Sequence, residues 1–507
     1  MSRNKVILVT VGVMLSLFMG SMEATVVATA MPTIATQLGG LELYSWVFSA
    51  YMLASTTTVP IYGKLSDVYG RRPVYAVAMV LFLIGSVLCA QSQSMAQLVT
   101  FRAIQGLGAG GLLPLAFIMI GDMFSFEQRA RMQGLFSGVW GVSSIIGPLL
   151  GGFLVDSVSW QWVFYVNVLP GLGALALVWF AWREAHREPR GSMPRVDYAG
   201  AVLLSAGVVT LLLGLFQLGT TTSGVLLALA TLLLIALGWI ERRVANPILP
   251  LPLFRNRLFS VACAHGVLAG AAVFGSASFV PLFMQAVLET TATVAGATLA
   301  PQLLGWVFAS IVGGRLLLHV GYRTIALTGT ITLTVGALLM TRIGVDISRF
   351  QLMVNLALMG IGMGLSIPAL LIAVQSDVRR DELGTATSTV QFSRSIGGAL
   401  GVSIMGLILS LRLVAGLRAG GLDPSTISVD RLMDPVAETN VSGALAAVVR
   451  GSLADAMVWV FAFGFITSAL SLAVTLLTPG GRIAQLGTPE KPEQTNQPVP
   501  AGVTETK

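Results

Sequence analysis

The sequence predicts an all-α integral membrane protein of fourteen transmembrane helices, and three observations support that fold class. Of its 507 residues, 55% are hydrophobic and 10% are charged, with a mean hydropathy of +0.82. Soluble proteins carry about 25% charged residues, so a chain with this composition cannot cover a water-exposed surface. Apolar segments long enough to cross a bilayer recur along the chain. An internal repeat then divides them into two halves of six, with two segments inserted between the halves.

The apolar segments are separated by polar connections. Within the long apolar run at 132–182, the sequence SVSWQW is typical of an aromatic turn at the membrane interface, so we divide that run into two spans. The expected spans cover approximately 6–30, 43–62, 73–91, 96–120, 132–155, 162–182, 198–219, 223–240, 258–285, 293–313, 324–341, 351–374, 384–411 and 452–477.

The positive charges predict the orientation of the chain. With a cytoplasmic N-terminus, six of the 30 Lys and Arg residues fall in outer segments, two lie within spans, and the rest lie inside. The positive-inside rule therefore places both termini in the cytoplasm, which requires an even number of spans. The net charge of +7 is then an orientation signal, and we expect no nucleic-acid partner. The expected location is the cytoplasmic (inner) membrane of a bacterium.

Three motifs recur in the two halves at offsets between 250 and 254 residues. The pairs are GKLSDVYGRR (63–72) with GRLLLHVGYR (314–323), QGLGAGGLLP (105–114) with MGIGMGLSIP (359–368), and GPLLGG (147–152) with GGALGV (397–402). The repeat predicts four regions: an N-terminal six-helix bundle at 1–183, inserted helices seven and eight with flanking cytoplasmic loops at 184–257, a C-terminal six-helix bundle at 258–480 with a long outer loop at 412–450, and a disordered cytoplasmic tail at 481–507.

Residues for catalysis or metal binding are scarce. Cys89 and Cys263 stand singly in apolar runs, and the three histidines form no ligand cluster. The sequence contains no P-loop, catalytic cluster or soluble sensory domain. We therefore expect no catalytic residues, no metal and no cofactor, and neither a membrane enzyme nor a receptor.

Glu23 needs an explanation, because a carboxylate inside a membrane span costs about 3 kcal/mol on insertion scales. Arg102, in the fourth expected span, is a matching cation. At 1.5 Å per residue, both lie in the outer half of a core about 30 Å thick, at similar depth. Gln105 follows nearly one turn after Arg102 on the same helix face.

The loop between expected spans two and three combines flexibility with charge. Gly63 and Gly70 permit tight turns and close helix approach. Asp67 can cap a helix or pair with a cation, and Arg71 and Arg72 can anchor at the anionic inner leaflet. We predict that these residues take part in conformational gating rather than forming an ordinary positive-inside loop.

At this point the residues resemble a known family. The loop GKLSDVYGRRP resembles the signature loop of the major facilitator superfamily, and LVTFRAIQGLGAGG resembles its motif with an embedded arginine. The sequence GVWGVSSIIGPLLGG resembles the antiporter motif of that superfamily. MEATVVATAMP, WQWVFYVNVLPG and NPILPLPLFRNR resemble the fourteen-span drug:proton antiporters, the EmrB/QacA-like family. This chain departs from the family pattern in carrying Glu23 in place of aspartate, Gln161 in place of arginine, and Leu318 where the repeat would place an acid.

The resemblance implies a major facilitator fold and roles for particular residues. That fold places spans one and four side by side, so Glu23, Arg102 and Gln105 are expected to meet and to couple proton movement to transport. The antiporter motif implies a gating role for Gly147, Pro148, Gly151 and Gly152, although glycines there also indicate close helix packing alone. The first half keeps the ionisable groups, so we assign proton coupling to it and cavity shape to the second. Crowding at Gly147 is then expected to be more harmful than crowding at Gly401.

Three further residues are candidates for the substrate cavity. Gln302 follows Pro301 in span ten, where the proline is equally a simple kink. His265 titrates near neutrality in solution, yet a hydrogen-bonded core histidine is the simpler interpretation. Arg394 in span thirteen is either a structural cation bonded to backbone carbonyls or a substrate or gating residue, and the structural role is favoured.

The function predicted from these features is secondary active export of hydrophobic, cationic drugs or other toxic compounds by alternating access, driven by inward proton flow. The expected partners are protons, membrane lipid and small hydrophobic or amphipathic substrates, and the expected state is a monomer. The alternative is export of an endogenous lipid or metabolite on the same scaffold, which the sequence does not separate from drug export.

Overall fold

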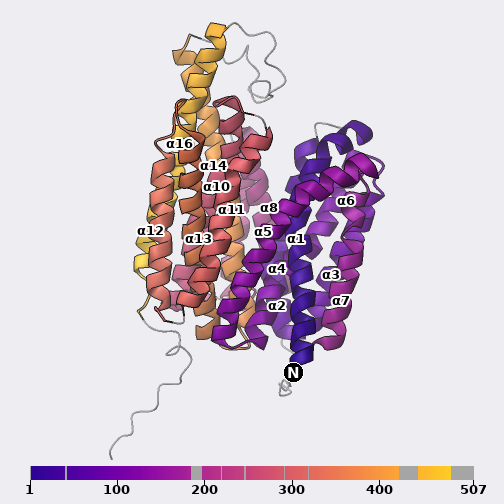
Figure 1. The fold of residues 1–507 in the computed structure, drawn as a ribbon. Helices are drawn as coiled ribbons and strands as arrows, with labels where there is room; N and C mark the ends of the chain where they lie inside the picture. The colour runs from indigo at the N-terminus through magenta and orange to yellow at the C-terminus, as the bar shows by residue number, and fades with distance from the viewer. Residues whose placement is uncertain are drawn as a thin grey trace, which may run out of the picture.

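The fold is all-helical throughout the part of the chain that the structure describes. This computed structural model describes residues 2–39, 43–183, 197–217, 220–244, 247–249, 251–290, 292–317, 319–421 and 443–480. Figure 1 shows long, roughly parallel helices in two groups, with the N-terminus at one end of the bundle. The predicted disordered tail at 481–507 lies outside the described residues.

The helices follow the order expected from the apolar segments. The first half consists of α1 (Arg3–Leu38), α2 (Tyr44–Tyr69), α3 (Arg71–Ala90), α4 (Met95–Met123), α5 (Phe126–Ser157), α6 (Trp162–Tyr165) and α7 (Val168–Ala181). The insertion holds α8 (Tyr198–Phe216), α9 (Thr221–Glu241) and the 3-10 helix η2 (Leu251–Arg255). The second half consists of α10 (Arg257–Ala286), α11 (Ala292–Leu316), α12 (Tyr322–Met340), α13 (Arg349–Asp377), α14 (Leu383–Ala419) and α16 (Gly443–Leu476).

Twelve candidate membrane spans are found in the described chain, so the predicted count of fourteen is not supported. The two helices outside this set are α2 and α5, which are 26 and 32 residues long. Polar residues dilute the apolar character of α2, which contains the run ASTTTVP. Both helices have the length of a span.

The internal repeat corresponds to the same helix packing in both halves. A Cβ atom on Gly108 of α4 would overlap the backbone nitrogen of Phe82 on α3. A Cβ atom on Gly362 of α13 would likewise overlap the backbone nitrogen of Leu333 on α12. These positions correspond under the repeat, so the repeated glycines are places where backbones come too close for a side chain.

The inserted helices pack on the outside of the two halves. α8 pairs with α9 and also contacts α2 and α14, so the insertion touches both halves. Leu204 and Leu212 of α8 form an apolar cluster with Leu53 of α2, Leu237 of α9 and Ala399 of α14. This contact fixes the position of α8 and α9. The boundaries predicted for the four regions remain a prediction.

Two helix boundaries differ from those expected. α14 continues to Ala419 and α16 starts at Gly443, so the expected outer loop at 412–450 is helical at both ends, and residues 422–442 lie outside the described chain. The expected span at 162–182 is divided into α6 and α7, with Asn167 as the residue that precedes α7.

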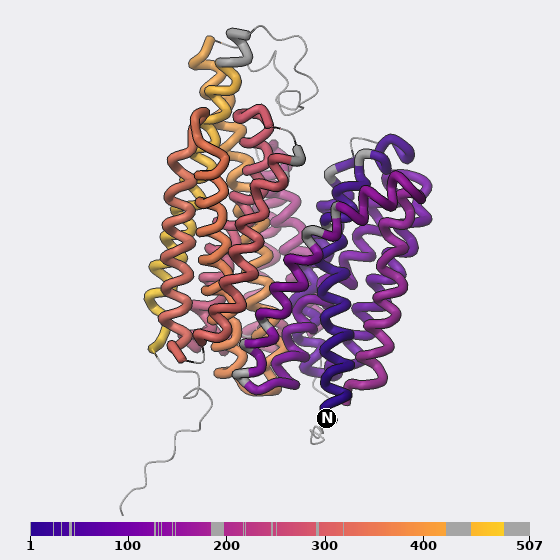
Figure 2. The backbone as a smooth tube through the Cα atoms, in the orientation of Figure 1, coloured from indigo at the N-terminus to yellow at the C-terminus, as the bar shows by residue number. Residues whose placement is uncertain are grey.

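The two halves meet through a small set of helices. α2 and α4 contact α14, and α5 contacts α11 and α13. Figure 2 traces α5 along the boundary between the two groups, beside α11. The groups approach each other at the end that carries the N-terminus and diverge toward the other end (Figure 1). We call the first of these the closed end.

Candidate functional site

A buried ion pair joins α1 and α4. Arg102 Nη1 donates to Glu23 Oε1 at 2.6 Å, and each side chain is only 1% exposed. Two further contacts position the guanidinium. Arg102 Nε donates to the backbone oxygen of Val47 at 3.2 Å, and the ring centroid of Tyr51 lies 4.1 Å from Arg102 Cζ. The sequence expectation that Glu23 and Arg102 meet is therefore met by the geometry.

Gln105 joins the same ion pair. Its Nε2 donates to Glu23 Oε1 at 3.0 Å and to Ser86 Oγ at 2.8 Å, and its Oε1 accepts from Arg102 Nη1 at 2.7 Å. α3 reaches this position because Gly85 has no side chain, and a Cβ atom there would lie 2.5 Å from the Gln105 nitrogen. The three residues predicted for proton coupling are thus in direct contact.

Asn167 completes the network and was missed by the sequence reasoning. Its Nδ2 donates to Glu23 Oε2 at 2.6 Å, and the residue is fully buried at the start of α7. An uncharged amide between apolar residues in the sequence FYVNVLPG was the available signal. With this bond, both oxygens of the Glu23 carboxylate accept from buried donors, a charge-assisted arrangement that is strong when complete and costly when broken.

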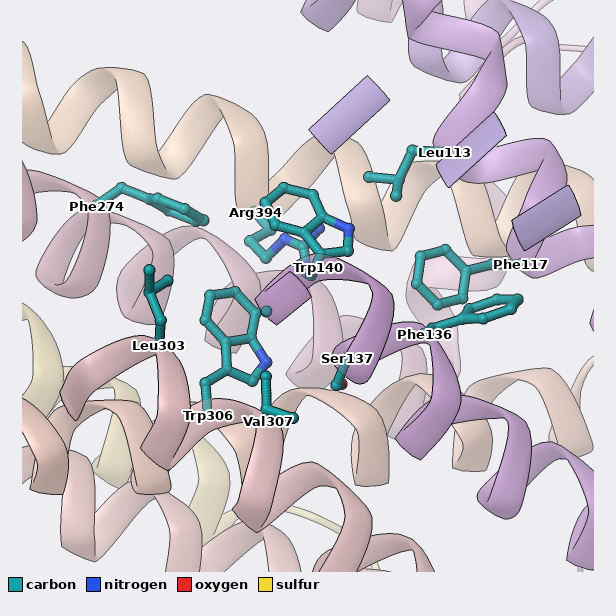
Figure 3. A pocket seen from close by; sticks show the side chains of 11 residues that line it. Leu113, Phe117, Phe136, Ser137, Trp140, Phe274, Leu303, Trp306, Val307 and Arg394 are labelled. Carbon is teal, nitrogen blue, oxygen red and sulfur yellow. The ribbon is translucent and has the colours of Figure 1, made fainter. Parts of the chain in front are cut away.

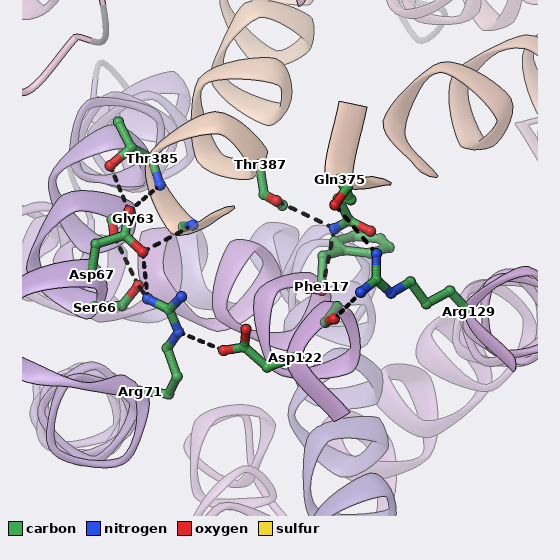
Figure 4. A network of polar contacts seen from close by, with 12 residues as sticks. Gly63, Ser66, Asp67, Arg71, Phe117, Asp122, Arg129, Gln375, Thr385 and Thr387 are labelled. Carbon is green, nitrogen blue, oxygen red and sulfur yellow. Dashed lines mark hydrogen bonds and ion pairs between the residues drawn. The ribbon is translucent and has the colours of Figure 1, made fainter. Parts of the chain in front are cut away.

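A second polar network lies at the closed end and includes Asp67 (Figure 4). Asp67 comes from α2 of the first half, but its carboxylate accepts from the start of α14 in the second half. Gly384 N donates to Oδ1 at 3.0 Å, and both the backbone nitrogen and Oγ1 of Thr385 donate to Oδ2 at 2.6 Å. Asp67 therefore caps a helix of the opposite half, where unpaired N–H groups and the helix dipole favour a negative charge.

Arg71 holds that carboxylate in place. Its Nη1 donates to Asp67 Oδ1 at 2.6 Å and to Ser66 Oγ at 3.0 Å, and its Nε donates to Asp122 Oδ2 at 2.8 Å. Asp122, at the end of α4, was not singled out in the sequence, because it resembles an ordinary residue of an inner loop.

The glycines of the loop permit its close contacts. A Cβ atom on Gly63 would overlap Ser388 Oγ of α14, which is why α2 and α14 approach so closely. Gly70 ends α2 with a φ of 97°, a conformation that L-residues with a side chain rarely adopt. The Arg72 guanidinium lies over Trp179 of α7, with its Cζ 4.1 Å from the ring centroid.

A further contact between the halves involves Arg129, which the sequence reasoning also missed. Its Nη1 donates to the backbone oxygen of Gln375 on α13 at 3.3 Å, while Gln375 Nε2 donates to Phe117 O at 3.4 Å and to Thr387 Oγ1 at 3.2 Å. Burial raises the pKa of Glu382, which precedes α14, and the Asp381 carboxylate acts in the same direction. Asp67 and Arg129 of the first half, which carry opposite charges, therefore both hold the second half at the closed end (Figure 4).

The glycines of the antiporter-like motif on α5 differ in their surroundings. A Cβ atom on Gly147 would overlap Thr25 Oγ1, and one on Gly151 would lie 2.9 Å from the backbone oxygen of Val26, both on α1. A Cβ atom on Gly152 would meet nothing within 4 Å. The side chain of Pro148 lies outside the described residues. Gly147 and Gly151 therefore bring α5 and α1 together, and Gly152 does not.

A cavity of about 580 Å³, including its open space, lies between the halves. Figure 3 shows its aromatic lining, with one cationic side chain among the rings. The residues that define its character are Phe117, Phe136, Ser137 and Trp140 from α4 and α5, and Phe274, Trp306 and Arg394 from α10, α11 and α14.

The three cavity candidates have different outcomes. Arg394 lines this cavity and a smaller neighbouring one. His265 lines only the smaller cavity, where its ring nitrogens contact the hydroxyls of Ser366, Ser471 and Thr475 at 2.9 to 3.1 Å. Gln302 is not among the residues that line the larger cavity, because its backbone packs against Gly360 of α13 and its side chain is buried.

The part of the chain that the structure describes holds no cluster of three or more His, Cys, Asp or Glu residues suited to a metal ion. Cys89 and Cys263 are both buried and unbridged. The candidate site is therefore made of three parts: the buried carboxylate network, the cavity, and the polar contacts at the closed end.

Comparisons with known proteins place the chain among transporters. The model of the Major Facilitator Superfamily matches residues 13–402. Multidrug transporter protein MdtP of Bacillus subtilis is 38% identical over 416 residues, which cover 81% of this chain and 76% of that protein. Multidrug resistance protein 3 of the same organism is 39% identical over 407 residues, which cover 79% of each. The solved structure of the proton:xylose symporter XylE aligns with a TM-score of 0.64 at 12% identity, over 94% of this chain and 97% of that one, which shows the fold alone.

Proposed function

Because this chain belongs to the major facilitator superfamily, we propose that it is a proton-coupled exporter of hydrophobic drugs or other toxic compounds, working by alternating access in a bacterial cytoplasmic membrane. The observation that carries the proposal is the buried contact of Glu23 with Arg102, Gln105 and Asn167 in a half that also lines the cavity. The names of the two Bacillus subtilis relatives, a multidrug transporter and a multidrug resistance protein, support drug export.

The chemistry of the buried carboxylate supports the proposed proton coupling. Glu23 is the one carboxylate that Arg102 contacts in the described chain, so protonating it removes half of an ion pair in a site that excludes water. A buried cation without its partner is unfavourable by several kcal/mol. We infer that a proton on Glu23 releases Arg102 and so favours a different packing of α1 and α4, which links the proton to the alternation of the two halves.

The closed end supplies the other part of the cycle. Opening there requires Asp67 to leave the N–H groups of α14 and Arg129 to leave Gln375. Each contact crosses from one half to the other, so both stabilise the conformation described here and neither survives separation of the halves at that end. We propose that the closed end faces the cytoplasm, in keeping with the positive charges of the loop at 63–72, and that both termini lie on that side.

We further propose that the chain belongs to the fourteen-span, EmrB/QacA-like drug:proton antiporters. In that arrangement α2 and α5 also cross the membrane, which their lengths of 26 and 32 residues allow. Both lie along helices that meet the length and composition required of a span, since α2 packs against α4 and α5 packs against α1. The inserted pair α8 and α9 brings the total to fourteen.

Uptake by inverted membrane vesicles tests the proposed function. Vesicles containing the protein should concentrate an exported drug when an imposed pH gradient makes the interior acidic, and an ionophore that abolishes the gradient should stop uptake. Vesicles from cells without the protein provide the background. Uptake that persists unchanged after the gradient is abolished would contradict proton coupling.

A further inference from the structure

We propose that the cavity between the halves binds an aromatic carboxylate, with Arg394 as its counter-ion and the rings of Trp140 and Trp306 as its walls. This inference rests on the proposed export function and names the class of substrate that the cavity fits. It differs from the cationic substrate expected from the sequence, because the charged group in the cavity is itself a cation.

The backbone of Arg394 is tightly packed, whereas its guanidinium has no partner within the described part of the chain. A Cβ atom on Gly270 of α10 would lie 2.5 Å from the Arg394 backbone oxygen, so α10 and α14 are tightly packed there. Within the described part of the chain, the Arg394 guanidinium makes no ion pair or hydrogen bond, whereas Arg102 pairs with Glu23 and Arg71 with Asp67. The sequence interpretation of Arg394 as a cation bonded to backbone carbonyls is therefore not the arrangement in this conformation.

An unpaired guanidinium between membrane helices calls for a partner from outside the chain. Charged residues inside a membrane protein are unfavourable unless they pair or serve a function. None of the 11 described residues that line the cavity is acidic, so the described part of the chain supplies no counter-charge there. A carboxylate matches the planar fork of arginine with two parallel N–H···O bonds, which gives both affinity and orientation.

The rest of the cavity suits a flat apolar body. Phe117 and Phe136 pack edge to face, with ring centroids 5.3 Å apart, and Phe274 lies 6.3 Å from Trp306 by the same measure. These pairs belong to opposite halves, and Figure 3 shows the indole of Trp140 between Phe274 and the rings of Phe117 and Phe136.

The buried carboxylate gives a substrate cation no open place in this conformation. Glu23 Oε1 accepts from Arg102 and Gln105, and Oε2 accepts from Asn167. A cationic drug would have to displace these donors. An anion instead meets an unpaired donor group, and the inside-negative membrane potential favours its outward movement.

The test measures binding of three probes that share one aromatic body. Pyrenebutyrate, the neutral pyrenebutanol and (4-pyrenylbutyl)trimethylammonium are titrated into the purified full-length protein in phosphatidylcholine nanodiscs, and quenching of tryptophan fluorescence reports binding. We expect pyrenebutyrate to bind about tenfold or more tightly than pyrenebutanol, the effect of one strong charge-assisted contact, and the ammonium probe to bind most weakly.

Three variants assign the preference to Arg394. In Arg394→Gln, the ratio of carboxylate to alcohol affinity should fall to about one, and in Arg394→Lys it should be intermediate because a point charge replaces the fork. Arg412→Gln is the matched control, since Arg412 lies over the ring of Trp459 and away from the cavity. It should keep the wild-type ratio.

Two results would overturn the proposal: tighter binding of the ammonium probe by the wild type, or an unchanged carboxylate preference in Arg394→Gln that elutes as a single species. The wild-type ranking of the three probes decides the question even if that variant does not fold. A protein that shows the carboxylate preference but no proton-driven uptake would contradict the proposed export function and leave the binding inference standing.

Discussion

At the scale of single residues, the closed end depends on one carboxylate that serves two helices. The Asp67 carboxylate accepts hydrogen bonds from Arg71 of its own half and from three donors at the start of α14. The repeat aligns Asp67 with Leu318 of the second half, so the second half has no acid at the corresponding position. The contact is therefore one-sided, and its loss is not compensated by symmetry.

Asp67→Asn should lower transport more than it lowers the amount of folded protein. The amide keeps the size of the side chain but loses the charge at the N-terminus of α14, an effect of about 1–2 kcal/mol for a capping acid, or about fivefold to thirtyfold in an equilibrium. Arg71 keeps its bond to Asp122, so the loop should still fold. Transport at matched protein level is the measurement.

Asp156→Asn is the control for this prediction, because Asp156 is an exposed acid near the C-terminal end of α5, away from the contacts of Asp67. It should transport as the wild type does. Near-normal transport by Asp67→Asn at matched protein level would show that the capping contact does not govern the cycle.

At the scale of elements, two pairs of helices that correspond under the repeat are packed with different tolerance. α5 approaches α1 at Gly147, where the obstacle to a Cβ atom is the side-chain oxygen of Thr25. α14 approaches α10 at Gly401, where a Cβ atom would lie 2.5 Å from the backbone oxygen of Ala271 and 2.6 Å from its Cα. A side chain can rotate away, but a helix backbone cannot.

Substitution by alanine should therefore harm α14 more than α5. We expect Gly401→Ala to reduce thermal stability and transport most, Gly147→Ala to do so less, and Gly152→Ala to behave as the wild type because its Cβ atom would meet nothing within 4 Å. This order reverses the sequence expectation that Gly147 is the more sensitive position. Thermal unfolding in detergent and vesicle uptake measure it, and equal damage at Gly152 and Gly401 would contradict the packing argument.

At the scale of the whole molecule, the sequence predicted what charge and periodicity can reveal. Glu23, Arg102 and Gln105 stand out because polar groups are rare in apolar runs, and their meeting followed from the fold that the motifs resemble. The repeated glycines at 106–110 and 360–364 predicted the relation between the halves because close packing permits no side chain.

Other features were not accessible from the sequence. Asn167 carries no charge, and its value as a donor depends on the break between α6 and α7, which hydropathy does not show. Two of the donors to Asp67 are backbone N–H groups of α14, which every residue except proline possesses, so no residue type indicates them. Length and composition together identify twelve candidate spans in the described chain, and α2 falls outside them because it combines the length of a span with a diluted apolar character.

The central claim is that Glu23 is the group that couples proton movement to export. The alternative is that Glu23 has a structural role and only holds α1, α4 and α7 together through its hydrogen bonds with Arg102, Gln105 and Asn167. The two differ in one property, because a structural role needs hydrogen bonds whereas coupling needs a group that takes up and releases a proton.

The most direct measurement is therefore uptake by inverted vesicles containing Glu23→Gln, with Glu23→Asp and the wild type at matched protein level. Glutamine keeps the size of the side chain and one acceptor oxygen but cannot titrate. We predict that Glu23→Gln is folded, still allows substrate to move down its gradient, and no longer concentrates substrate under a pH gradient, whereas Glu23→Asp keeps part of the activity with an altered pH dependence. If Glu23→Gln concentrates substrate as the wild type does, and an uncoupler abolishes that uptake, then Glu23 is structural and protons are coupled elsewhere.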